Sequence, residues 1–464
     1  MANKKKFYIT TAIDYVNSRP HVGHAFEKVI ADALARWHRL QGDNVFYLTG
    51  TDENAQKNAQ AAKEAGIETK KFVDRNSEIF IELCKKLNIS YDDFIRTTEK
   101  RHVKKVQEIF KKVHDKGEIY KGKYEGYYCT GCEAFITEKD LINGKCPEHN
   151  KEPEWFSEEA YFFKLSKYRD KLIKFVQKYI VPKSRRNEIL ARLKTEELKD
   201  LCVSRTGLDW GIDSPIDKKF KVYVWFDALS NYITGAGKNG EFWPAEVHVV
   251  GKGINWFHSV IWPAILMSAG YKLPETLLVH GYLNLSGKKI SKSQGNVIDP
   301  IELADKYGSD AVRYSLLRCS VFEDSDYSEE ILIERNNNEL ANKLGNLVSR
   351  VSTLAEKYGI EKTTNKLLKK LKLNEIEKNF ENFELDKALN EIFAFIDVCN
   401  EYVQSKKPWE TKDTKVLYEL VESIRETAKL LSSFIPETAE KILQIFKTDK
   451  IKKAPVLFEK IKSS

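Results

Sequence analysis

At 464 residues the chain is too long for one ordinary domain and suits two to four packed units. Hydrophobic residues make up 42% of it and aromatic residues 11%, a composition that excludes a mainly disordered protein. The formal net charge of +8 permits a polyanionic partner but does not indicate one by itself.

Cysteine usage and the apolar segments indicate the compartment. The seven cysteines are an odd number and three of them fall in one short window, which argues against a disulfide framework and for a reducing compartment. The most apolar stretch, residues 259–270, contains a proline and is too short to cross a bilayer. The beginning of the chain has no signal-like run. We therefore expect a cytoplasmic protein with no membrane partner and with a local metal site.

The first 115 residues alternate between strand and helix patterns. Residues 7–12 and 45–49 are short apolar runs typical of buried strands. Between them, apolar residues recur at helical spacing over residues 26–37, and Gly42 follows the end of that pattern. Strand, helix and strand in this order predict a parallel nucleotide-binding sheet.

The rest of the chain predicts an interruption, a return to the sheet and a closing bundle. Turn-rich sequence interrupts the alternation after residue 115, strands are expected at residues 221–226 and 247–250, and a buried helix at 258–269. After residue 336 the pattern is helical only. We predict an α/β fold with a Rossmann-type parallel sheet, a zinc-knuckle insertion and a C-terminal all-α bundle. The expected units are residues 1–115 and 219–280 for the sheet, 116–218 for the insertion, 281–335 for a linker and 336–464 for the bundle.

Two histidines stand at the predicted start of the first helix. His21 and His24 are three residues apart and share a face, with Gly23 between them. The unpaired N–H groups and the positive end of a helix form a natural anion site, and a glycine lets a ligand approach the backbone. Because such a short pattern is common by chance, two ordinary helix-start histidines are the alternative.

A second candidate phosphate site lies about 265 residues later in the chain. Lys289 and Lys292 are three residues apart in the run Lys-Ile-Ser-Lys-Ser, flanked by glycines. Alone, this run is most simply a solvated basic turn. Both motifs, in this order around an interrupted nucleotide-binding sheet, resemble the two ATP motifs of class I aminoacyl-tRNA synthetases.

The three clustered cysteines predict a metal site. Cys129 and Cys132 form one Cys-x2-Cys knuckle, and Cys146 and His149 form a second pair after thirteen residues. Thiolate and imidazole ligands in two such pairs suit a tetrahedral Zn²⁺. Because protein fills all four positions, this zinc is expected to be structural. The remaining cysteines, at positions 84, 202, 319 and 399, are typical of core thiols.

Further segments narrow the resemblance over almost the whole chain to the methionyl-tRNA synthetase family. They are residues 12–17, 50–53, 222–228, 256–263, 346–350 and 408–409. The resemblance implies ATP with Mg²⁺, L-methionine and tRNA(Met) as partners. It implies activation of methionine to methionyl-adenylate and transfer to the 3′ end of the tRNA. It places Gly251 with His21, Gly23, His24, Lys289 and Lys292 at the ATP.

A methionine pocket is expected from residues that match the family's pocket. A thioether side chain calls for an apolar, polarisable slot with a weak donor near the sulfur. Tyr232 and His258 are the expected polar pair, and Asp52 is the expected partner of the ammonium group. The apolar members are Ile13, Tyr15, Trp225, Ala228, Leu229, Ile254 and Phe257. For each aromatic residue taken alone, ordinary core packing is the alternative.

Two departures from the family pattern concern the pocket and the ribose of ATP. The family often has Gly-Lys-Asp where this chain has Gly251-Lys252-Gly253, so the acid thought to hold the ribose is missing. Ala12 and Leu229 occupy positions that are proline in some members. These differences indicate an altered pocket rather than a different substrate.

The predicted bundle carries a candidate tRNA site. Asn342, Asn346 and Arg350 are four residues apart and form a polar stripe, and Pro408 precedes an expected exposed Trp409. Such residues can hydrogen-bond and stack on splayed bases. The resemblance implies that Asn346, Arg350 and Trp409 read the anticodon. A solvated helix face and a core tryptophan are the alternative.

Other interpretations differ in substrate or in chemistry. A class I synthetase for isoleucine, leucine or valine would carry a larger editing insertion, and a cysteine enzyme would hold zinc in its amino-acid pocket. A non-catalytic tRNA-binding paralogue would not need the intact histidines and lysines. The chain stops soon after the bundle, which favours a monomer.

Overall fold

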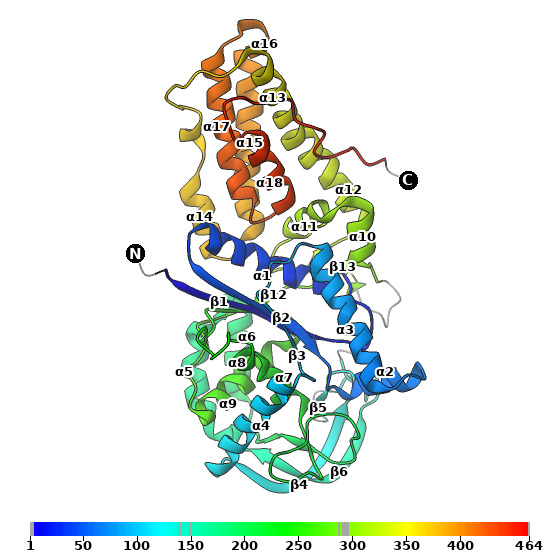
Figure 1. Cartoon of the computed structure of the whole chain (residues 1–464). Helices are drawn as coiled ribbons and strands as arrows, with labels where there is room; N and C mark the ends of the chain where they lie inside the picture. Colours follow the sequence, from blue (N-terminus) through cyan, green and yellow to red (C-terminus); the bar gives the residue numbers. More distant parts are fainter. Residues whose placement is uncertain are drawn as a thin grey trace.

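The computed structural model describes residues 4–136, 138, 141–147, 150–285, 288–289 and 297–462. It has a central sheet with helices, a helical bundle on one side of that sheet and an antiparallel insertion on the other (Figure 1). The predicted α/β class with a terminal bundle is confirmed. Within the described ranges, no helix is both long enough and apolar enough to span a bilayer.

The central sheet has six strands in the order β3-β2-β1-β11-β12-β7, and every neighbouring pair is parallel. Its strands are β1 (Lys6–Tyr15), β2 (Asn44–Asp52), β3 (Asp93–Arg96), β7 (Ile180–Val181), β11 (Val247–Gly251) and β12 (Thr276–His280). The strand order reverses between β1 and β11. Open parallel sheets bind ligands at such a point, outside the carboxyl ends of the strands.

One predicted strand is wrong. Within residues 221–226, only β10 (Lys221–Val222) is extended, and it pairs antiparallel with β9 (Ser204–Arg205) outside the central sheet. The chain then forms the buried helix α7 (Val224–Leu229). A short apolar run looks the same in a buried strand and in a buried helix, so its pattern could not distinguish them. The predicted helix at 258–269 is present as η4 (Phe257–Ile261), a π-helical turn, and α9 (Trp262–Ala269).

The insertion folds as a four-stranded antiparallel sheet in the order β5-β4-β6-β8. Its strands are β4 (Ile119–Cys129), β5 (Ala134–Ile136), β6 (Glu154–Phe163) and β8 (Leu201–Cys202), and its helices are α5 (Arg169–Tyr179) and α6 (Lys183–Thr195). Strand β7, between these two helices, returns to pair with β12 at the edge of the central sheet. The insertion is therefore tied to the sheet within its own length.

Helices pack on both faces of the sheet and form the bundle. Those of the sheet region and the linker are α1 (Val22–Leu40), α2 (Gln56–Glu64), α3 (Thr69–Lys86), α4 (Lys100–Asp115), α8 (Asn231–Thr234), α10 (Pro300–Tyr307), α11 (Ser309–Leu317) and α12 (Glu329–Arg335). The bundle contains the π-helical segment η6 (Asn336–Gly345), α13 (Asn346–Tyr358), α14 (Leu373–Glu381), α15 (Leu385–Lys406), α16 (Pro408–Thr411), α17 (Thr414–Leu431) and α18 (Pro436–Ile445).

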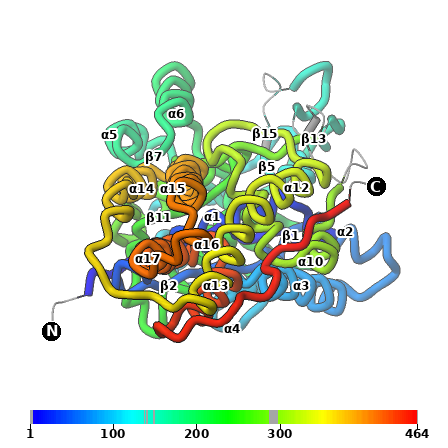
Figure 2. Tube along the Cα trace, turned by 90° about the horizontal axis from the view of Figure 1, so that it is seen from above, coloured from blue at the N-terminus to red at the C-terminus, as the bar shows by residue number. Residues whose placement is uncertain are grey.

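Helix α1 lies between the sheet and the bundle (Figure 1; Figure 2 shows the bundle from above). Buried residues of α1 belong to the same apolar core as those of the bundle helices. Trp37 of α1 stacks on Phe380 of α14, with 4.1 Å between the ring centroids. The helix that begins at the two histidines thus connects the sheet to the bundle.

A buried arginine joins three parts of this interface. Arg313 of α11 is fully buried and pairs with the Asp32 carboxylate of α1 at 2.7 Å. It also donates to the carbonyl oxygens of Leu87, after α3, and Phe434, between α17 and α18. Burial raises the pKa of Asp32, but Arg313 and Arg36 outweigh this effect and hold it below its usual value. The charge pair therefore stays ionised inside the protein.

Replacing Arg313 with methionine should destabilise the fold strongly. The Asp32 carboxylate would lose its main partner inside the protein, and breaking a buried pair typically costs ~3–5 kcal/mol. Guanidinium unfolding should show this loss in the free energy of unfolding. Lys111→Met is the control, because Lys111 and Asp115 form a solvent-exposed pair, and such pairs contribute little to stability. Equal stability of the two variants would contradict this account of Arg313.

Candidate active site

A cleft of about 1070 Å³ opens at the carboxyl edge of the central sheet. Tyr15, Asp52, Gly251 and His280 are the last residues of β1, β2, β11 and β12, and all four line it. The start of α1 contributes His21, Gly23 and His24. Parallel pairing places these strand ends at one edge, so residues far apart in the sequence share a single cavity.

The two histidines cap helix α1. His21 is the N-cap, and its Nδ1 accepts from the Gly23 N–H at 3.0 Å, while His24 Nδ1 accepts from the His21 N–H at 3.0 Å. Burial, with Lys28 and Lys57 nearby, lowers the pKa of His24 to about 3. Its ring is therefore neutral at pH 7 and carries its proton on Nε2. From this position it can donate a hydrogen bond but brings no positive charge.

Gly23 is required by the cap as well as by any ligand. A Cβ at this position would lie 2.8 Å from Cε1 of His21 and 2.9 Å from its Nδ1. The capping ring thus occupies the space beside the glycine. A side chain at residue 23 would displace it.

The lysine segment, which carries Lys289 and Lys292, is flanked by described residues that lie at the cleft and at the start of α1. Leu283 lines the cleft and begins β13 (Leu283–Leu285), which pairs with β14 (Lys288–Lys289) and with β15 (Ser325–Asp326). After the motif, the Ile298 carbonyl accepts from the Val22 N–H at 3.1 Å, and Asp299 pairs with Arg19 at 2.9 Å. The flank before the motif therefore lies in the cleft wall, and the flank after it lies beside the helix start. Lys292 and the side chain of Lys289 lie outside the described residues.

The residues expected at the methionine are brought together, with one exception. All but Phe257 line the cleft: Ile13, Tyr15, Asp52, Trp225, Ala228, Leu229, Tyr232, Ile254 and His258. Phe257 instead stacks against Trp225, with 3.7 Å between the centroids and 7° between the planes. It supports the pocket wall from behind. Residues 257 and 258 are adjacent on a helical turn and point to different faces. The sequence resemblance matches both of them and does not say which one faces the pocket.

Tyr232 and His258 are hydrogen-bonded to each other. Their Oη and Nε2 atoms are 2.7 Å apart, and His258 Nδ1 lies 3.0 Å from the Ile254 carbonyl oxygen. Burial lowers the pKa of His258 to about 4. A neutral ring that donates to Ile254 from Nδ1 must accept from Tyr232 at Nε2. The expected polar pair thus forms a hydrogen-bond chain in which Tyr232 donates to His258 and His258 donates to the Ile254 carbonyl. The lone pairs of the Tyr232 oxygen remain able to accept a hydrogen bond.

Asp52 is a buried carboxylate at the end of β2 and is 2% exposed. Its pKa lies well above the usual value, first because of burial and then because of the neighbouring carboxylates of Asp227 and Glu133. Lys57 opposes this shift and stands 3.4 Å over the ring of Tyr15. Burial lowers the pKa of Lys57 itself to about 8. A ligand cation near Asp52 would therefore stabilise its ionised carboxylate beside the neighbouring negative charges.

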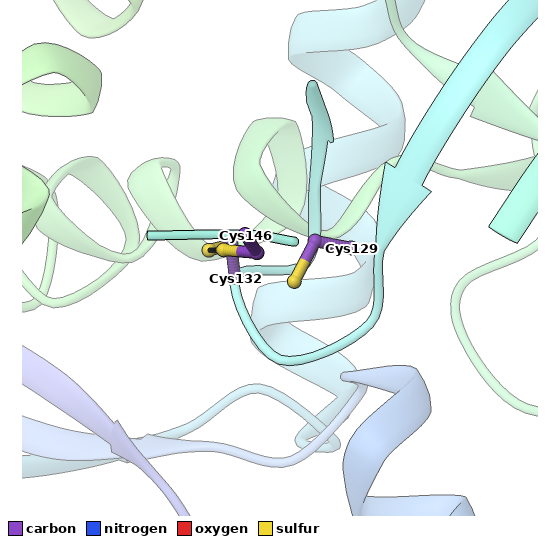
Figure 3. Close-up of side chains that lie close together, drawn as sticks. All are labelled: Cys129, Cys132 and Cys146. Carbon is purple, nitrogen blue, oxygen red and sulfur yellow. Dashed lines mark hydrogen bonds between the residues drawn. The ribbon is translucent and has the colours of Figure 1, made fainter. Parts of the chain in front are cut away.

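The three cysteines meet beside this pocket (Figure 3). The Sγ atoms of Cys129, Cys132 and Cys146 all lie within 4.8 Å of one another. Thiolates about 2.3 Å from one tetrahedral ion would show such separations, so these residues could hold a metal ion. His149, the predicted fourth ligand, lies outside the described residues. The other four cysteines are buried and free, as predicted.

The cysteine turn also touches the pocket wall. The Lys57 ammonium donates to the Gly131 carbonyl at 2.9 Å, and the Trp225 indole N–H donates to the Cys132 carbonyl at 3.4 Å. Backbone groups of the turn thus hold two side chains that line the cleft.

In the bundle, the polar stripe and the tryptophan lie together. The Arg350 guanidinium is 5.4 Å from the centroid of the Trp409 ring and donates to Gln404 at 3.1 Å. Asn342 and Asn346 are exposed. Trp409 is half-buried against the bundle core rather than fully exposed as expected, because α16 starts at the buried Pro408 and turns its second residue inward.

Sequence reasoning missed several polar residues of the cleft. They are Asp14, Glu27, Lys57, His280 and Tyr282. Glu27 had a detectable signal, because it follows His24 by three residues and shares its helix face. The others had none, since they reach the cleft from β1, α2, β12 and the loop before β13 and share no local pattern.

Two family models match the chain. Residues 7–153 and 137–352 match the model described as tRNA synthetases class I (M). Residues 365–462 match the model of the anticodon-binding domain of tRNA ligases. The class I model therefore extends into α13, the first α-helix of the bundle.

Proteins of similar sequence and structure agree with these models. The methionine–tRNA ligase of Clostridium tetani is 45% identical over 96% of this chain and 74% of its own length. That of Rickettsia bellii is 44% identical over 94% of this chain and 92% of its own length. A solved structure of Mycobacterium tuberculosis methionyl-tRNA synthetase in complex with methionyl-adenylate gives a TM-score of 0.91 at 37% identity, covering 99% of each chain. The chain therefore belongs to the methionine–tRNA ligase family of class I tRNA synthetases.

Proposed function

We propose that this methionine–tRNA ligase family member uses the cleft at the carboxyl edge of its sheet to join L-methionine to AMP and then to charge tRNA(Met). The observation that carries the proposal is the meeting of three features in one cavity. They are a capped helix start, the flanks of the lysine segment, and an apolar slot with a buried carboxylate. Together they suit a triphosphate beside a thioether amino acid.

The methionine carboxylate attacks the α-phosphate of ATP, so no side-chain nucleophile is needed. The protein's part is to position the reactants and to stabilise charge on the phosphoryl group and on the leaving pyrophosphate. His21 and His24 donate hydrogen bonds to phosphate oxygens, and Gly23 and Gly251 allow close approach of the nucleotide. Lys289 and Lys292 supply positive charge from the segment that returns to α1. Mg²⁺ bound with ATP adds further neutralisation.

Asp52 binds the ammonium group of methionine, and the slot around Trp225, Tyr232 and His258 takes the side chain. The wall of this slot is completed by Ile13, Tyr15, Ala228, Leu229 and Ile254, with Phe257 behind Trp225. Because the Tyr232 proton is directed to His258, the sulfur meets the hydroxyl oxygen and the aromatic faces. The pocket thus selects by shape and polarisability more than by a hydrogen bond to sulfur.

Cys129, Cys132 and Cys146, with His149, hold a structural Zn²⁺. The ion would fix the turn whose carbonyl groups accept from Lys57 and Trp225. Four protein ligands leave no open position for catalysis.

Asn346, Arg350 and Trp409 read the anticodon, with Arg350 and Trp409 acting as one surface. The domain division predicted from the sequence, a monomeric state and a cytoplasmic location complete the proposal. The similarity to methionine–tRNA ligases favours methionine over the amino acids of the other class I enzymes.

The first test is methionine-dependent ATP–pyrophosphate exchange with a Lys292→Ala variant. Removing one charged donor of this kind costs about 10²–10³ in rate, while methionine binding should stay nearly unchanged. Lys111→Ala, on the exposed face of α4, is the matched control. Normal exchange by the Lys292 variant would refute its role, and failure of the native protein to respond to methionine would refute the proposed function.

The second test concerns the protonation of Asp52. Because its pKa is raised, lowering the pH through that value protonates the carboxylate and removes its attraction for the ammonium group. The KM for methionine should therefore rise as the pH falls, and the rise should begin at a higher pH than for an ordinary aspartate. The pKa values of His24, about 3, and His258, about 4, lie below the usual histidine value, so neither ring gains a proton near neutral pH.

Asp52→Asn should weaken methionine binding by about 10- to 100-fold and flatten the pH dependence. Ser18→Ala, at the rim of the same cleft, is the control. A steep pH dependence that survives in the Asn variant would assign the effect to another group.

The third test separates charging from activation. Trp409→Ala should weaken aminoacylation of tRNA by about 1–3 kcal/mol in kcat/KM, the usual value of one base stack, and leave pyrophosphate exchange intact. Trp155→Ala is the matched control, because Trp155 is 60% exposed on the insertion. Equal losses in both reactions would show that Trp409 acts through the fold instead.

A further inference from the structure

Gly253 and Tyr282 share one small space in the wall of the cleft. Both line the cleft, and a Cβ built on Gly253 would lie 2.1 Å from the Tyr282 hydroxyl oxygen. The phenol oxygen therefore stands where the side chain of residue 253 would begin. This is the position at which the chain lacks the acid that the family often carries.

The ring of Tyr282 is held in this place from several sides. Its backbone N–H donates to the Asp324 carboxylate at 2.9 Å, and the same carboxylate accepts from the Lys252 ammonium at 2.6 Å. That ammonium lies 4.6 Å from the centroid of the Tyr282 ring. The preceding residue, Gly281, packs so closely that a Cβ there would lie 2.4 Å from the Glu323 carbonyl oxygen. These contacts hold the backbone of Tyr282 and one face of its ring in place.

A buried carboxylate lies in the same wall. Glu27 lines the cleft and is 7% exposed. Its Oε2 accepts from the Gly251 N–H at 3.1 Å and faces His280 Nε2 at 3.1 Å. Its Oε1 is buried and has no hydrogen-bond partner within the described residues. A buried carboxylate oxygen without a donor is costly, so it indicates a ligand that supplies one.

These groups distinguish between the parts of a nucleotide. A phosphate has no proton to give to Glu27 at neutral pH and would be repelled by its charge. A ribose hydroxyl can donate to Glu27 and exchange a hydrogen bond with a phenol. The helix start takes the phosphates, so the wall formed by Gly251, Gly253 and Tyr282 is left for the sugar.

Building on the proposed function, we propose that Tyr282 replaces the missing acid and hydrogen-bonds a ribose hydroxyl of ATP, with Glu27 Oε1 as a second acceptor. The phenol reaches from the loop between β12 and β13 the point that an aspartate at residue 253 would reach from the turn after β11. Because it is neutral, it adds no negative charge beside the triphosphate. Residues 253 and 282 are therefore expected to be interdependent.

The first experiment compares ATP with 2′-deoxy-ATP and 3′-deoxy-ATP in the native protein and in Tyr282→Phe. The native protein should lose about 3- to 10-fold in KM with the analogue that lacks the contacted hydroxyl, the value of one hydrogen bond. Tyr282→Phe should lose a similar factor with ATP and show little further loss with that analogue. Tyr358→Phe, at the end of α13 and outside the cleft, is the matched control.

The second experiment restores the acid. Gly253→Asp alone should impair ATP binding by more than 10-fold, because its Cβ meets the Tyr282 hydroxyl. Tyr282→Phe removes that oxygen, and the ring carbon behind it is 3.5 Å from the Cβ, an ordinary contact. The double variant should therefore bind ATP better than Gly253→Asp.

Two results would overturn the proposal. One is that 2′-deoxy-ATP and 3′-deoxy-ATP show the same increase in KM over ATP, both in the native protein and in Tyr282→Phe. The other is a double variant that binds ATP no better than Gly253→Asp alone. Methionine affinity, measured by calorimetry without ATP, does not depend on the sugar contact. If the native protein binds methionine and catalyses methionine-dependent exchange with ATP, these two results overturn the assignment of Tyr282 and leave the proposed function standing.

Discussion

Parallel pairing of β1 with β2 on one side and with β11 on the other is the constraint on which the rest of the structure depends. It reverses the strand order at β1 and leaves a crevice at the carboxyl edge. Tyr15, Asp52 and Gly251 end these three strands and meet there, although about 200 residues separate the last two. The insertion reaches this edge, since Pro147, Asn150 and Lys151 line the cleft, whereas the bundle packs on α1.

Burial sets the chemistry of the groups in the crevice. It makes His24 and His258 neutral and raises the pKa of Asp52, so two neutral rings and a carboxylate poised for a cation line the crevice. Under the proposed function, positive charge for a triphosphate would come from the helix start and from the lysine segment. A neutral phenol at Tyr282 fits the same design, since it adds a polar contact without adding charge.

The parts outside the sheet act on the cleft through a few contacts. The cysteine turn holds Lys57 and Trp225 through carbonyl oxygens, and α1 carries the capped histidines at one end and packs on the bundle along its length. Arg313 fixes α1 to α11 and to the turn before α18. Motion of the bundle relative to the sheet would therefore disturb α1 first. These contacts connect the bundle to the helix start that lines the cleft.

Local patterns in the sequence were enough to predict the parallel sheet, the bundle, the helix start at the two histidines and the cysteine cluster, because each depends on residues close together in the chain. They did not predict that the histidine rings cap this helix. They could not decide residues 221–226, where a buried apolar run fits a strand and a helix equally well. They also could not place Phe257 behind Trp225 or bring Tyr282 against Gly253. Those positions are set by packing between segments distant in sequence, and only the tertiary structure shows which oxygen fills the space that a missing side chain leaves.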